Sequence, residues 1–139
     1  MGTINYKILE ATDRSVFAQV APGTFDFPLQ SDLIDEFLAD PRHHMAVAID
    51  DCAVVGVVSA VTYIHPDKPL HCWINEVSTA PSHRRQGIAR RLVDNLVKHL
   101  KDLGCGEIWL ATEVDNEPAR ALYRAAGAKE TPIVMYSFD

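Results

Sequence analysis

A short stretch in the middle of the chain combines a carboxylate, two adjacent arginines and a glycine. It runs from Asn75 and Glu76 to Arg84, Arg85 and Gly87, and it joins an apolar segment to an amphipathic one. A basic loop that opens a helix offers unpaired backbone N–H groups and the positive end of the helix dipole, and a glycine lets the backbone approach a ligand closely. This combination favours a bound pyrophosphate. A carboxylate on the preceding strand adds a candidate base, so the stretch predicts group transfer from a phosphate-bearing cofactor.

The segments on either side of this loop are predicted to hold it between a strand and a long helix. Residues 71–78 are apolar and β-branched enough to form the strand, on which Ile74, Glu76 and Ser78 would alternate on one face with the carboxylate half-buried. Apolar residues then recur at helical spacing from Ile88, and a glycine at 104 ends that helix. Residues 107–112 form the next strand, which is buried and parallel to the first if a helix crosses between them.

The rest of the chain supplies the other elements of one predicted domain, residues 1–139. The predicted order is β-α-α-β-β-β-α-β-α-β, an α/β fold with a mixed sheet and helices on both faces. Besides the segments above, the expected elements are a strand over 3–10, a short helix capped by Thr12 or Asp13, a helix with the apolar stripe Leu29, Leu33, Ile34, Phe37 and Leu38, a hairpin of 45–49 and 54–61 turning at Asp50-Asp51-Cys52, a helix from Asn116 to Gly127, and a final strand over 131–138.

Composition limits the possible partners. The chain of 139 residues has a formal net charge of −6, yet residues 81–91 hold four arginines and no acid. A nucleic-acid-binding protein is usually basic overall, so this local charge favours a small polyanion, while the acidic remainder attracts a cationic second substrate. No apolar run is long enough to span a membrane and the N-terminus does not resemble a signal peptide, which predicts a cytoplasmic protein. The apolar run 133–136 is a candidate edge for a homodimer.

Histidine and cysteine spacing argues against two other chemistries. The six histidines follow no metal-ligand spacing, so no metal site is predicted, although His43 or His44 could contact an acceptor. The three cysteines include no CxxC pair, which disfavours a disulfide framework. None of them belongs to a Cys-His-Asp arrangement, so a covalent intermediate on a cysteine is not expected.

Two motifs resemble those of the GNAT superfamily of acetyl-CoA-dependent N-acetyltransferases. Residues 84–89, Arg-Arg-Gln-Gly-Ile-Ala, match its phosphate-loop pattern R/Q-x-x-G-x-G/A. The second motif, N-x-x-A-x-x-L-Y-x-x-x-G, is matched by Asn116, Ala119, Leu122, Tyr123 and Gly127. Within the superfamily the chain is similar to the small aminoglycoside 3-N-acetyltransferases in its length, in the acid of the preceding strand and in the His-Arg-Arg-Gln-Gly-Ile-Ala stretch.

The resemblance implies a binding site for acetyl-CoA. It implies a splay between the strands at 71–78 and 107–112 that frees main-chain groups for the pantetheine arm. The expected cofactor contacts are Val77, Ser78, Thr79, Arg84, Arg85, Gln86, Gly87, Ile88, Ala89, Asn116, Ala119 and Tyr123.

Catalytic roles are expected for two residues, for Tyr123 from the resemblance and for Glu76 from its place on the strand. Tyr123 would protonate the departing thiolate of coenzyme A. Glu76 would take a proton from the acceptor ammonium, or else anchor the substrate's charge or form a structural salt bridge. Phe25 and Asp26 are further candidates for contact with the acceptor.

The expected reaction is acetyl transfer to a primary amine of a small cationic acceptor by direct attack in a ternary complex. An aminoglycoside acetylated at a 3-amine is the first hypothesis. A polyamine, an amino acid or a peptide N-terminus is the alternative acceptor. A non-catalytic acyl-CoA sensor is a hypothesis of another class, and tight acetyl-CoA binding without turnover on any amine would distinguish it.

Overall fold

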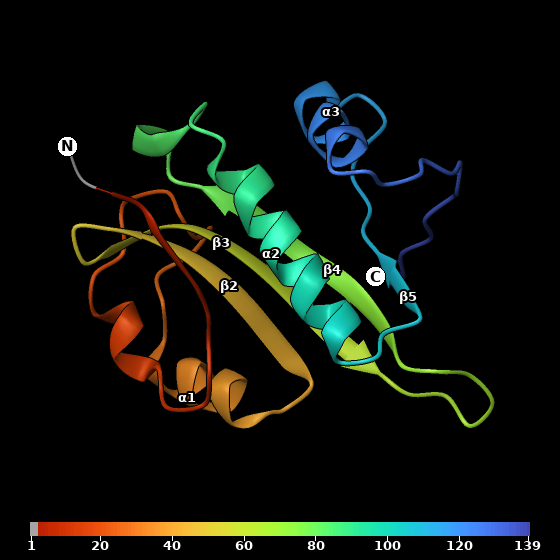
Figure 1. Cartoon of the computed structure of the whole chain (residues 1–139), viewed down its shortest axis with the longest axis horizontal. Helices are drawn as coiled ribbons and strands as arrows, with labels where there is room; N and C mark the ends of the chain where they lie inside the picture. Colours follow the sequence, from red (N-terminus) through yellow and green to blue (C-terminus); the bar gives the residue numbers. More distant parts are fainter. Residues whose placement is uncertain (1–2) are drawn as a thin grey trace.

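Residues 3–139, the part of the chain that the computed structural model describes, form an open sheet of five strands that lie side by side in chain order (Figure 1). Strands β1 to β4 pair antiparallel, whereas β5 pairs with β4 in the parallel direction. This mixed sheet confirms the α/β class expected from the sequence. The elements are β1 (Asn5–Ile8), η1 (Arg14–Ala18), α1 (Ser31–Ala39), β2 (His43–Asp50), β3 (Ala53–Tyr63), β4 (His71–Thr79), η2 (Pro81–His83), α2 (Ile88–Asp102), β5 (Glu107–Trp109) and α3 (Glu117–Ala125).

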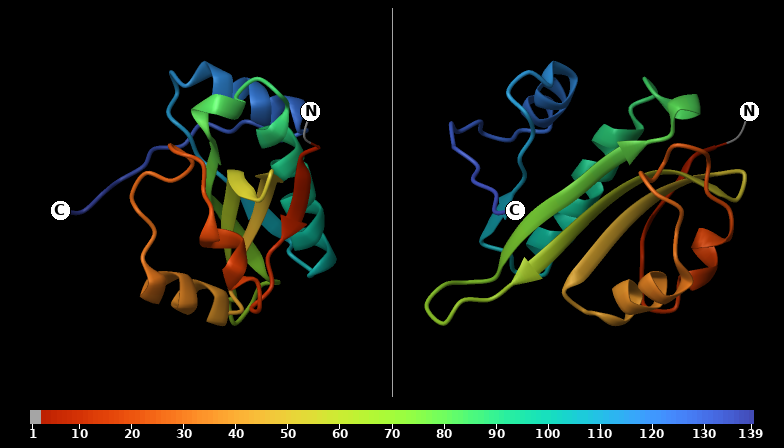
Figure 2. Two further views of the ribbon diagram at one scale, coloured as in Figure 1. Left: turned by 90° about the vertical axis from the view of Figure 1, so that its left-hand side faces the viewer. Right: turned by 180° about the vertical axis from the view of Figure 1, so that it is seen from behind.

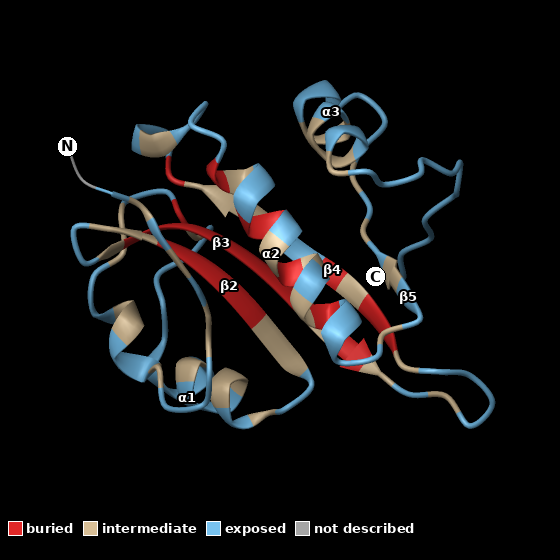
Figure 3. Ribbon diagram, viewed as in Figure 1, coloured by how far each residue is buried: buried red, intermediate tan, exposed pale blue. Residues whose placement is uncertain are grey.

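The two central strands form the predicted hairpin. Their β-branched and alanine-rich runs pair from His43 opposite Val61 to Asp50 opposite Ala53. Asp51 and Cys52 make the turn with φ angles of 49° and 68°, which is the left-handed geometry of a two-residue turn that suits the twist of a hairpin. Most of these residues are buried, as the colouring of β2 and β3 in Figure 3 shows.

Helices cover the two faces of the sheet, as predicted. On one face α2 buries Ile88, Leu92, Leu96 and Leu100 against the strands. On the other face, half-buried side chains of η1 and α1, including Phe17 and Phe37, pack around Met45, Val47, Val54 and Val57. The sheet is therefore the middle layer of three, and both of its faces contribute to the core.

A glycine sets how closely α2 approaches the sheet. A Cβ at Gly56 of β3 would lie 2.9 Å from Ile88 Cγ2 and 3.0 Å from Leu92 Cδ1, closer than carbon atoms normally pack. The absent side chain thus lets the first turn of α2 rest directly on the strand. Since the basic loop leads into this turn, the contact also fixes the position of the loop.

Strands β4 and β5 diverge after a short stretch of pairing. Their ladder holds only three pairs, from His71 opposite Glu107 to Trp73 opposite Trp109, although β4 continues to Thr79. Beyond Trp73 the two strands separate, and the edge of β4 that faces β5 has no strand partner (Figure 2, right). This is the splay that the resemblance implied.

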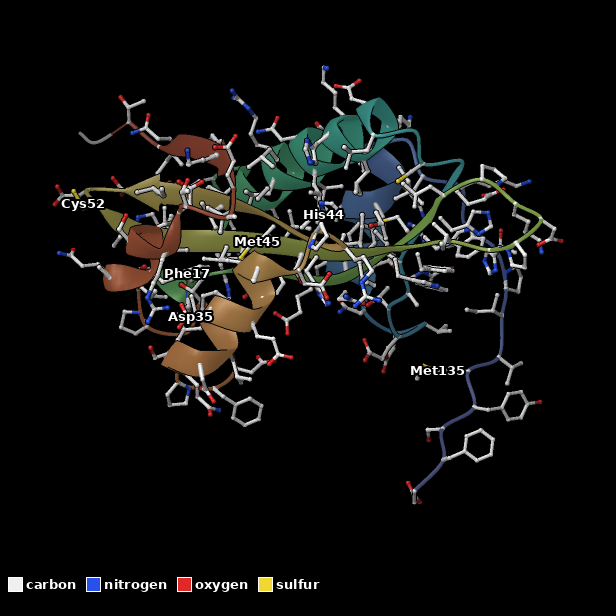
Figure 4. All side chains as sticks on the ribbon, turned by 90° about the horizontal axis from the view of Figure 1, so that it is seen from below. Phe17, Asp35, His44, Met45, Cys52 and Met135 are labelled. Carbon is white, nitrogen blue, oxygen red and sulfur yellow. The ribbon has the colours of Figure 1, made fainter. Side chains whose placement is uncertain are left out.

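Several elements differ from the sequence prediction, and the largest difference is at the C-terminus. No strand forms over 131–138 in the described chain. Instead this apolar run extends away from the sheet, where Met135 is 84% exposed (Figure 4). A β-branched run becomes a strand only when its backbone pairs with another strand. Here the salt bridges that join the segment after α3 to the rest of the described chain are those of Glu130 with Arg120 and Arg124, and they do not supply such a partner.

The other corrections concern boundaries and helix type. The first strand is shorter than 3–10, the strand expected over 107–112 ends at Trp109, and the helix after Asp13 is a single 3₁₀ segment. In α1 the predicted stripe is only partly correct, because Leu29 precedes the helix and Leu33 is 51% exposed. None of the helices within residues 3–139 has the length and apolar composition that a membrane crossing requires.

The contact at Gly56 can be tested by adding one methyl group. We expect Gly56→Ala to lower the free energy of unfolding by about 1–3 kcal/mol, because the new Cβ overpacks the interface of α2 with β3. Gly106→Ala is the matched control, since its Cβ would meet Pro69 Cγ at a similar 2.9 Å but on an exposed loop that can move. Urea unfolding measures both variants, and equal losses of stability would contradict the proposed contact.

Candidate functional site

The basic loop, residues 81–87, presents a row of backbone N–H groups that the protein does not use. The first backbone hydrogen bond of α2 runs from Arg91 N–H to Gly87 C=O. Within residues 3–139, the N–H groups from Arg85 to Arg90 donate no hydrogen bond. Gly87 is the N-cap residue and has no side chain with which to satisfy them. These free donors and the positive end of the helix dipole together form an anion-binding geometry.

The backbone of this loop is held in an unusual conformation. Arg85 has a φ of 62° and Gly87 a φ of 78°, both in the left-handed region. That region is costly for a residue with a Cβ, and such strain is concentrated at functional sites. Around Gly87 there is open space, since a Cβ built there has no other group within 4 Å. The loop is therefore shaped to expose its backbone.

The four arginines of the segment differ in what they contact. Arg90 donates to Asp94 and Arg91 stacks over the ring of Tyr6 at 4.9 Å, so both side chains are engaged by the protein. Arg84 and Arg85 are exposed, and neither makes a hydrogen bond or ion pair to any described residue. From the sequence, the four arginines formed one basic cluster. In the structure, the side chains of Arg84 and Arg85 are the two that remain free to bind a ligand.

A chain of side chains that the sequence analysis missed anchors the start of the loop. His83 Nε2 donates to Asp50 Oδ2 at 2.7 Å, and Ser82 Oγ lies 2.7 Å from His83 Nδ1. Asp50 ends β2, so this link ties the basic loop to the hairpin across 33 positions of sequence. No local pattern could reveal it, because its two halves meet only when the sheet is assembled.

Glu76 lies on the opposite face from the one predicted by simple alternation. The pairing of β3 with β4 shifts between Ser59 and Ala60, which face Glu76 and Ile74 respectively, so Asn75 is the extra residue of a β-bulge. Before the bulge Ile74 packs towards α2, and after it Val77 does so. Glu76 therefore faces away from α2, and it is exposed rather than half-buried. The prediction that Ile74, Glu76 and Ser78 share one face was wrong for this reason.

Val77, Ser78 and Thr79 lie on the unpartnered edge of β4. All three are half-buried, and they pair with β3 on one side only. Their main-chain groups on the other side face the splay. Buried backbone groups are normally hydrogen-bonded, so this edge is suited to an extended ligand with amide groups.

Tyr123 is on α3 and packs into the layer of α2. Its half-buried ring contacts the same apolar cluster as Val77 and Leu110. Burial raises the pKa of its hydroxyl above the ordinary value, so the phenol stays protonated at neutral pH. The hydroxyl makes no hydrogen bond to the described part of the chain, and is thus a free donor.

The second motif also has a structural role. Asn116 caps α3, because its side-chain oxygen accepts a hydrogen bond from Ala119 N–H at 3.2 Å. Pro118 follows in the first turn, where its missing N–H is no loss. The motif therefore sets where α3 begins, and with it the position of Tyr123.

Glu76 and Tyr123 lie on opposite sides of the sheet, and Glu76 lies on the part of β4 beyond its pairing with β5. Tyr123 belongs to the α2 layer, as does the basic loop from which α2 starts, while Glu76 points to the other face. A ligand that runs from the basic loop along β4 would reach the gap from the α2 side. A second ligand approaching from the far side would meet the carboxylate first. The arrangement can bring two reactants together through the splay.

The loop with Phe25 and Asp26 is fixed at the end of the sheet from which the basic loop leaves. A Cβ at Gly23 would lie 2.7 Å from Pro81 Cδ, so the two loops are in contact. Phe25 is half-buried against Phe17, and Asp26 is exposed beside it in a shallow hollow. The structure does not show either residue in contact with Glu76.

The cysteines and histidines form no reactive group with one another. No set of three or more His, Cys, Asp or Glu side chains within residues 3–139 is placed to hold a metal ion. Burial, with a smaller contribution from Cys105, raises the pKa of Cys72 to about 12, so this thiol stays protonated. Cys52 is exposed, but it lies at the tip of the β2–β3 turn (Figure 4).

The comparison with known protein families decides the family. The sequence profile of the Acetyltransferase (GNAT) family matches residues 9–128, which includes the whole of both motifs. This chain belongs to the GNAT acetyltransferase family. Acetyltransferases of this family use acetyl-CoA, and the expectation drawn from the two motifs is confirmed at this level.

Individual relatives differ in their acceptors. The chain is 35% identical over 81 residues to N-alpha-acetyltransferase 30 of Schizosaccharomyces pombe, covering 58% of this chain but only 54% of that protein. It is 31% identical over 107 residues, 73% of each chain, to an aminoglycoside N(6')-acetyltransferase of Serratia marcescens. Its fold matches that of an aminoglycoside acetyltransferase from an uncultured soil metagenomic sample, with a TM-score of 0.80, 18% identity and coverage of 97% and 95%.

The link between His83 and Asp50 makes a prediction for the basic loop. We expect His83→Ala to speed amide hydrogen exchange in residues 81–87, because the loop loses its side-chain anchor to the hairpin. The free energy of unfolding should fall by about 1.5–3 kcal/mol, the contribution of a hydrogen bond to a charged group. Lys98→Ala is the control, since it breaks an exposed ion pair with Asp102 on the far part of α2. Unchanged exchange in 81–87 would show that the link does not order the loop.

Proposed function

We propose that this protein transfers an acetyl group from acetyl-CoA to a primary amine of a small cationic acceptor. The observation that carries the proposal is the splay of β4 from β5, with an unused anion-binding loop and a protonated tyrosine on one side and a carboxylate on the other. Membership of the GNAT family identifies the cofactor as acetyl-CoA. The residues of the site then have separate tasks of binding, orientation and proton transfer.

The basic loop binds the pyrophosphate of acetyl-CoA. The free N–H groups of Arg85, Gln86, Gly87, Ile88 and Ala89 donate to its oxygens, and the side chains of Arg84 and Arg85 add charge-assisted hydrogen bonds. The open space at Gly87 allows the phosphates to approach the backbone. Asn116 and Ala119 keep the start of α3 beside the same ligand.

The edge of β4 orients the thioester end of acetyl-CoA. The backbone of Val77, Ser78 and Thr79 forms hydrogen bonds with the amide groups of the pantetheine arm. The arm lies where a partner strand would lie, because β5 does not pair with this part of β4. Backbone N–H near Val77 stabilises the oxyanion that forms when an amine attacks the thioester. Holding both reactants in one gap provides part of the acceleration through orientation.

Two side chains move protons on opposite sides of the reacting carbonyl. Glu76 accepts a proton from the acceptor ammonium, directly or through water, so that the neutral amine attacks. Tyr123 donates its proton to the sulfur of coenzyme A as it leaves. The raised pKa of Tyr123 keeps this proton in place at neutral pH. Because Glu76 is exposed, it can also attract the charged acceptor from solvent.

An aminoglycoside is the acceptor that we place first. The net charge of −6 favours a polycation, and the Serratia relative supports this class through its name and its coverage of the chain. That name specifies the 6′-amine, so the 3-amine expected from the sequence stays a prediction. Phe25 and Asp26 remain candidate contacts for the acceptor. Cytoplasmic location and a homodimer are likewise predictions.

A peptide N-terminus is the second candidate acceptor. The Schizosaccharomyces pombe relative is named an N-alpha-acetyltransferase, which supports an α-amine as acceptor, and it has the higher identity, though over a shorter stretch. Initial rates of coenzyme A release on aminoglycosides, polyamines, amino acids and short peptides distinguish the two classes. Acetyl-CoA binding without turnover on any of these amines would favour the acyl-CoA sensor instead.

The role of Tyr123 predicts a specific kinetic change. We expect Tyr123→Phe to lower kcat on the order of 10²-fold and to leave the Kd of acetyl-CoA nearly unchanged, because the ring still packs while the proton donor is lost. Calorimetry and steady-state kinetics measure the two quantities. A parallel loss of affinity and turnover would assign Tyr123 to binding alone.

The role of Glu76 predicts a specific loss of turnover. With Glu76 as base, Glu76→Gln should lower kcat on the order of 10²-fold and leave the KM for the acceptor nearly unchanged, because the proton acceptor is lost while the side chain keeps its size and polarity. Asn75→Ala, one residue away in the bulge, is the control for a local structural effect. A raised KM with an unchanged kcat in Glu76→Gln would leave the residue an anchor rather than a base.

The free arginines predict which charges matter for the cofactor. We expect Arg84→Ala and Arg85→Ala each to raise the Kd of acetyl-CoA by about 10- to 100-fold, since each removes a charge-assisted contact of about 1.5–3 kcal/mol. Arg90→Ala should have a much smaller effect, because its side chain is already paired with Asp94. Equal effects of all three would mean that the basic segment acts only through its overall charge.

A further inference from the structure

Five aromatic rings form a cluster at the closed end of the splay. We name it the aromatic floor, and it consists of Tyr63, His65, His71, Trp73 and Trp109. Centroids of contacting rings are 5.0 to 5.9 Å apart, which is the range of favourable aromatic pairs. The strands that carry it are β3, β4 and β5, with His65 in the loop that follows β3.

The floor lies on the same face of the sheet as Glu76. Trp73 is opposite Val61 in the ladder of β3 with β4, and the bulge at Asn75 returns Glu76 to the face of Trp73. Trp73 and Trp109 are also the last pair of β4 with β5, so their rings, 5.3 Å apart, stand where the strands begin to diverge. Glu76 is three residues further along, roughly 10 Å at the spacing of a strand. The floor and the carboxylate therefore flank one side of the gap.

This part of the sheet is not covered by the chain. The elements on that face, η1 and α1, pack over β2 and β3, and Figure 2 (right) shows β4 open beside them. Trp109 is 37% exposed and Trp73 is half-buried. Two large indole side chains on an uncovered surface indicate a ligand-binding role in addition to packing.

His71 supplies a second sign that the floor is not only structural. Its side chain is 6% exposed and its ring contacts those of Tyr63, His65 and Trp109. Its Nδ1 is buried without a hydrogen-bond partner. Buried polar atoms are nearly always paired, and an apolar ring would fill the same place without this cost. The unpaired Nδ1 of His71 at the centre of the cluster therefore favours a polar ligand bound to the aromatic floor.

We propose that the aromatic floor is a binding surface for the acceptor and that it selects amines carried on a ring-shaped scaffold. The flat faces of Trp73 and Trp109 attract an ammonium and pack against a ring, while Glu76 pairs with the charge. A flexible linear amine loses more conformational entropy on the same surface and gains less contact. The proposal deepens the proposed acetyl transfer and rests on it.

Both tryptophans of the chain belong to the floor, so tryptophan emission, excited selectively over tyrosine, reports this surface alone. The matched probes are cyclohexylamine and n-hexylamine, with kanamycin and spermidine as the polycationic pair. With coenzyme A present, we expect the ring-bearing member of each pair to change the tryptophan emission saturably and with at least a tenfold lower Kd. No response to any of the four amines would overturn the proposal.

Variants of Trp109 separate recognition from folding. Trp109→Leu should raise the KM for cyclohexylamine and kanamycin about tenfold and the KM for n-hexylamine clearly less, because the linear amine loses the cation–π attraction but no ring packing, and it should leave the Kd of acetyl-CoA unchanged. Trp109→Phe should restore most of the selectivity because it keeps a ring. His71→Phe should raise the melting temperature, since it removes an unpaired polar atom, yet weaken binding of the ring amines. An unchanged ratio of KM for ring and linear amines in Trp109→Leu would refute the proposal.

The same measurements distinguish this proposal from the proposed function. Acetyl transfer that does not depend on Trp109 would leave the function standing and reject the aromatic floor as its acceptor surface. If no amine is acetylated, the fluorescence titration still decides whether ring amines bind. The apolar segment 131–138 is the other possible occupant. A red shift of the emission in Met135→Asp, without any response to amines, would assign the floor to that segment and reject the proposal.

Discussion

The separation of β4 from β5 is the constraint on which the rest of the site depends. Pairing ends after Trp73 and Trp109, so the backbone of Val77 to Thr79 faces a gap instead of a ladder. Unpaired main-chain groups in a half-buried position are costly unless a ligand satisfies them. The gap thus gives a reason for an extended ligand, and it provides a route by which groups on the two faces of the sheet can act on the same atom.

Two packing contacts keep the gap aligned with the basic loop. The missing side chain of Gly56 lets α2 rest on β3, which fixes the first turn of α2 and its free N–H groups. The pair of His83 with Asp50 holds the other end of the loop against the hairpin. Both contacts join segments that are far apart in the sequence. Precise placement of the proposed pyrophosphate site is therefore a property of the sheet and not of the motif.

The bulge at Asn75 has a comparable effect on the other reactant. It turns Glu76 away from α2 and onto the face of Trp73, so that the carboxylate and the aromatic floor share one side of the sheet. Tyr123 stays on the opposite side, where burial keeps its hydroxyl protonated. One extra residue in β4 thus separates the proposed cofactor side of the site from the proposed acceptor side. Bulges near active sites commonly redirect side chains in this way.

The sequence by itself determined the family, the mixed sheet and the position of the basic loop, because these follow from local periodicity, turn residues and two contiguous motifs. Tertiary structure alone decided the direction of Glu76, the freedom of Arg84 and Arg85, and the clustering of Trp73 with Trp109. Each of these depends on register or on contacts between distant segments, which a local pattern does not contain. The missing strand at 131–138 has the same cause, since a strand needs a partner as well as a β-forming sequence.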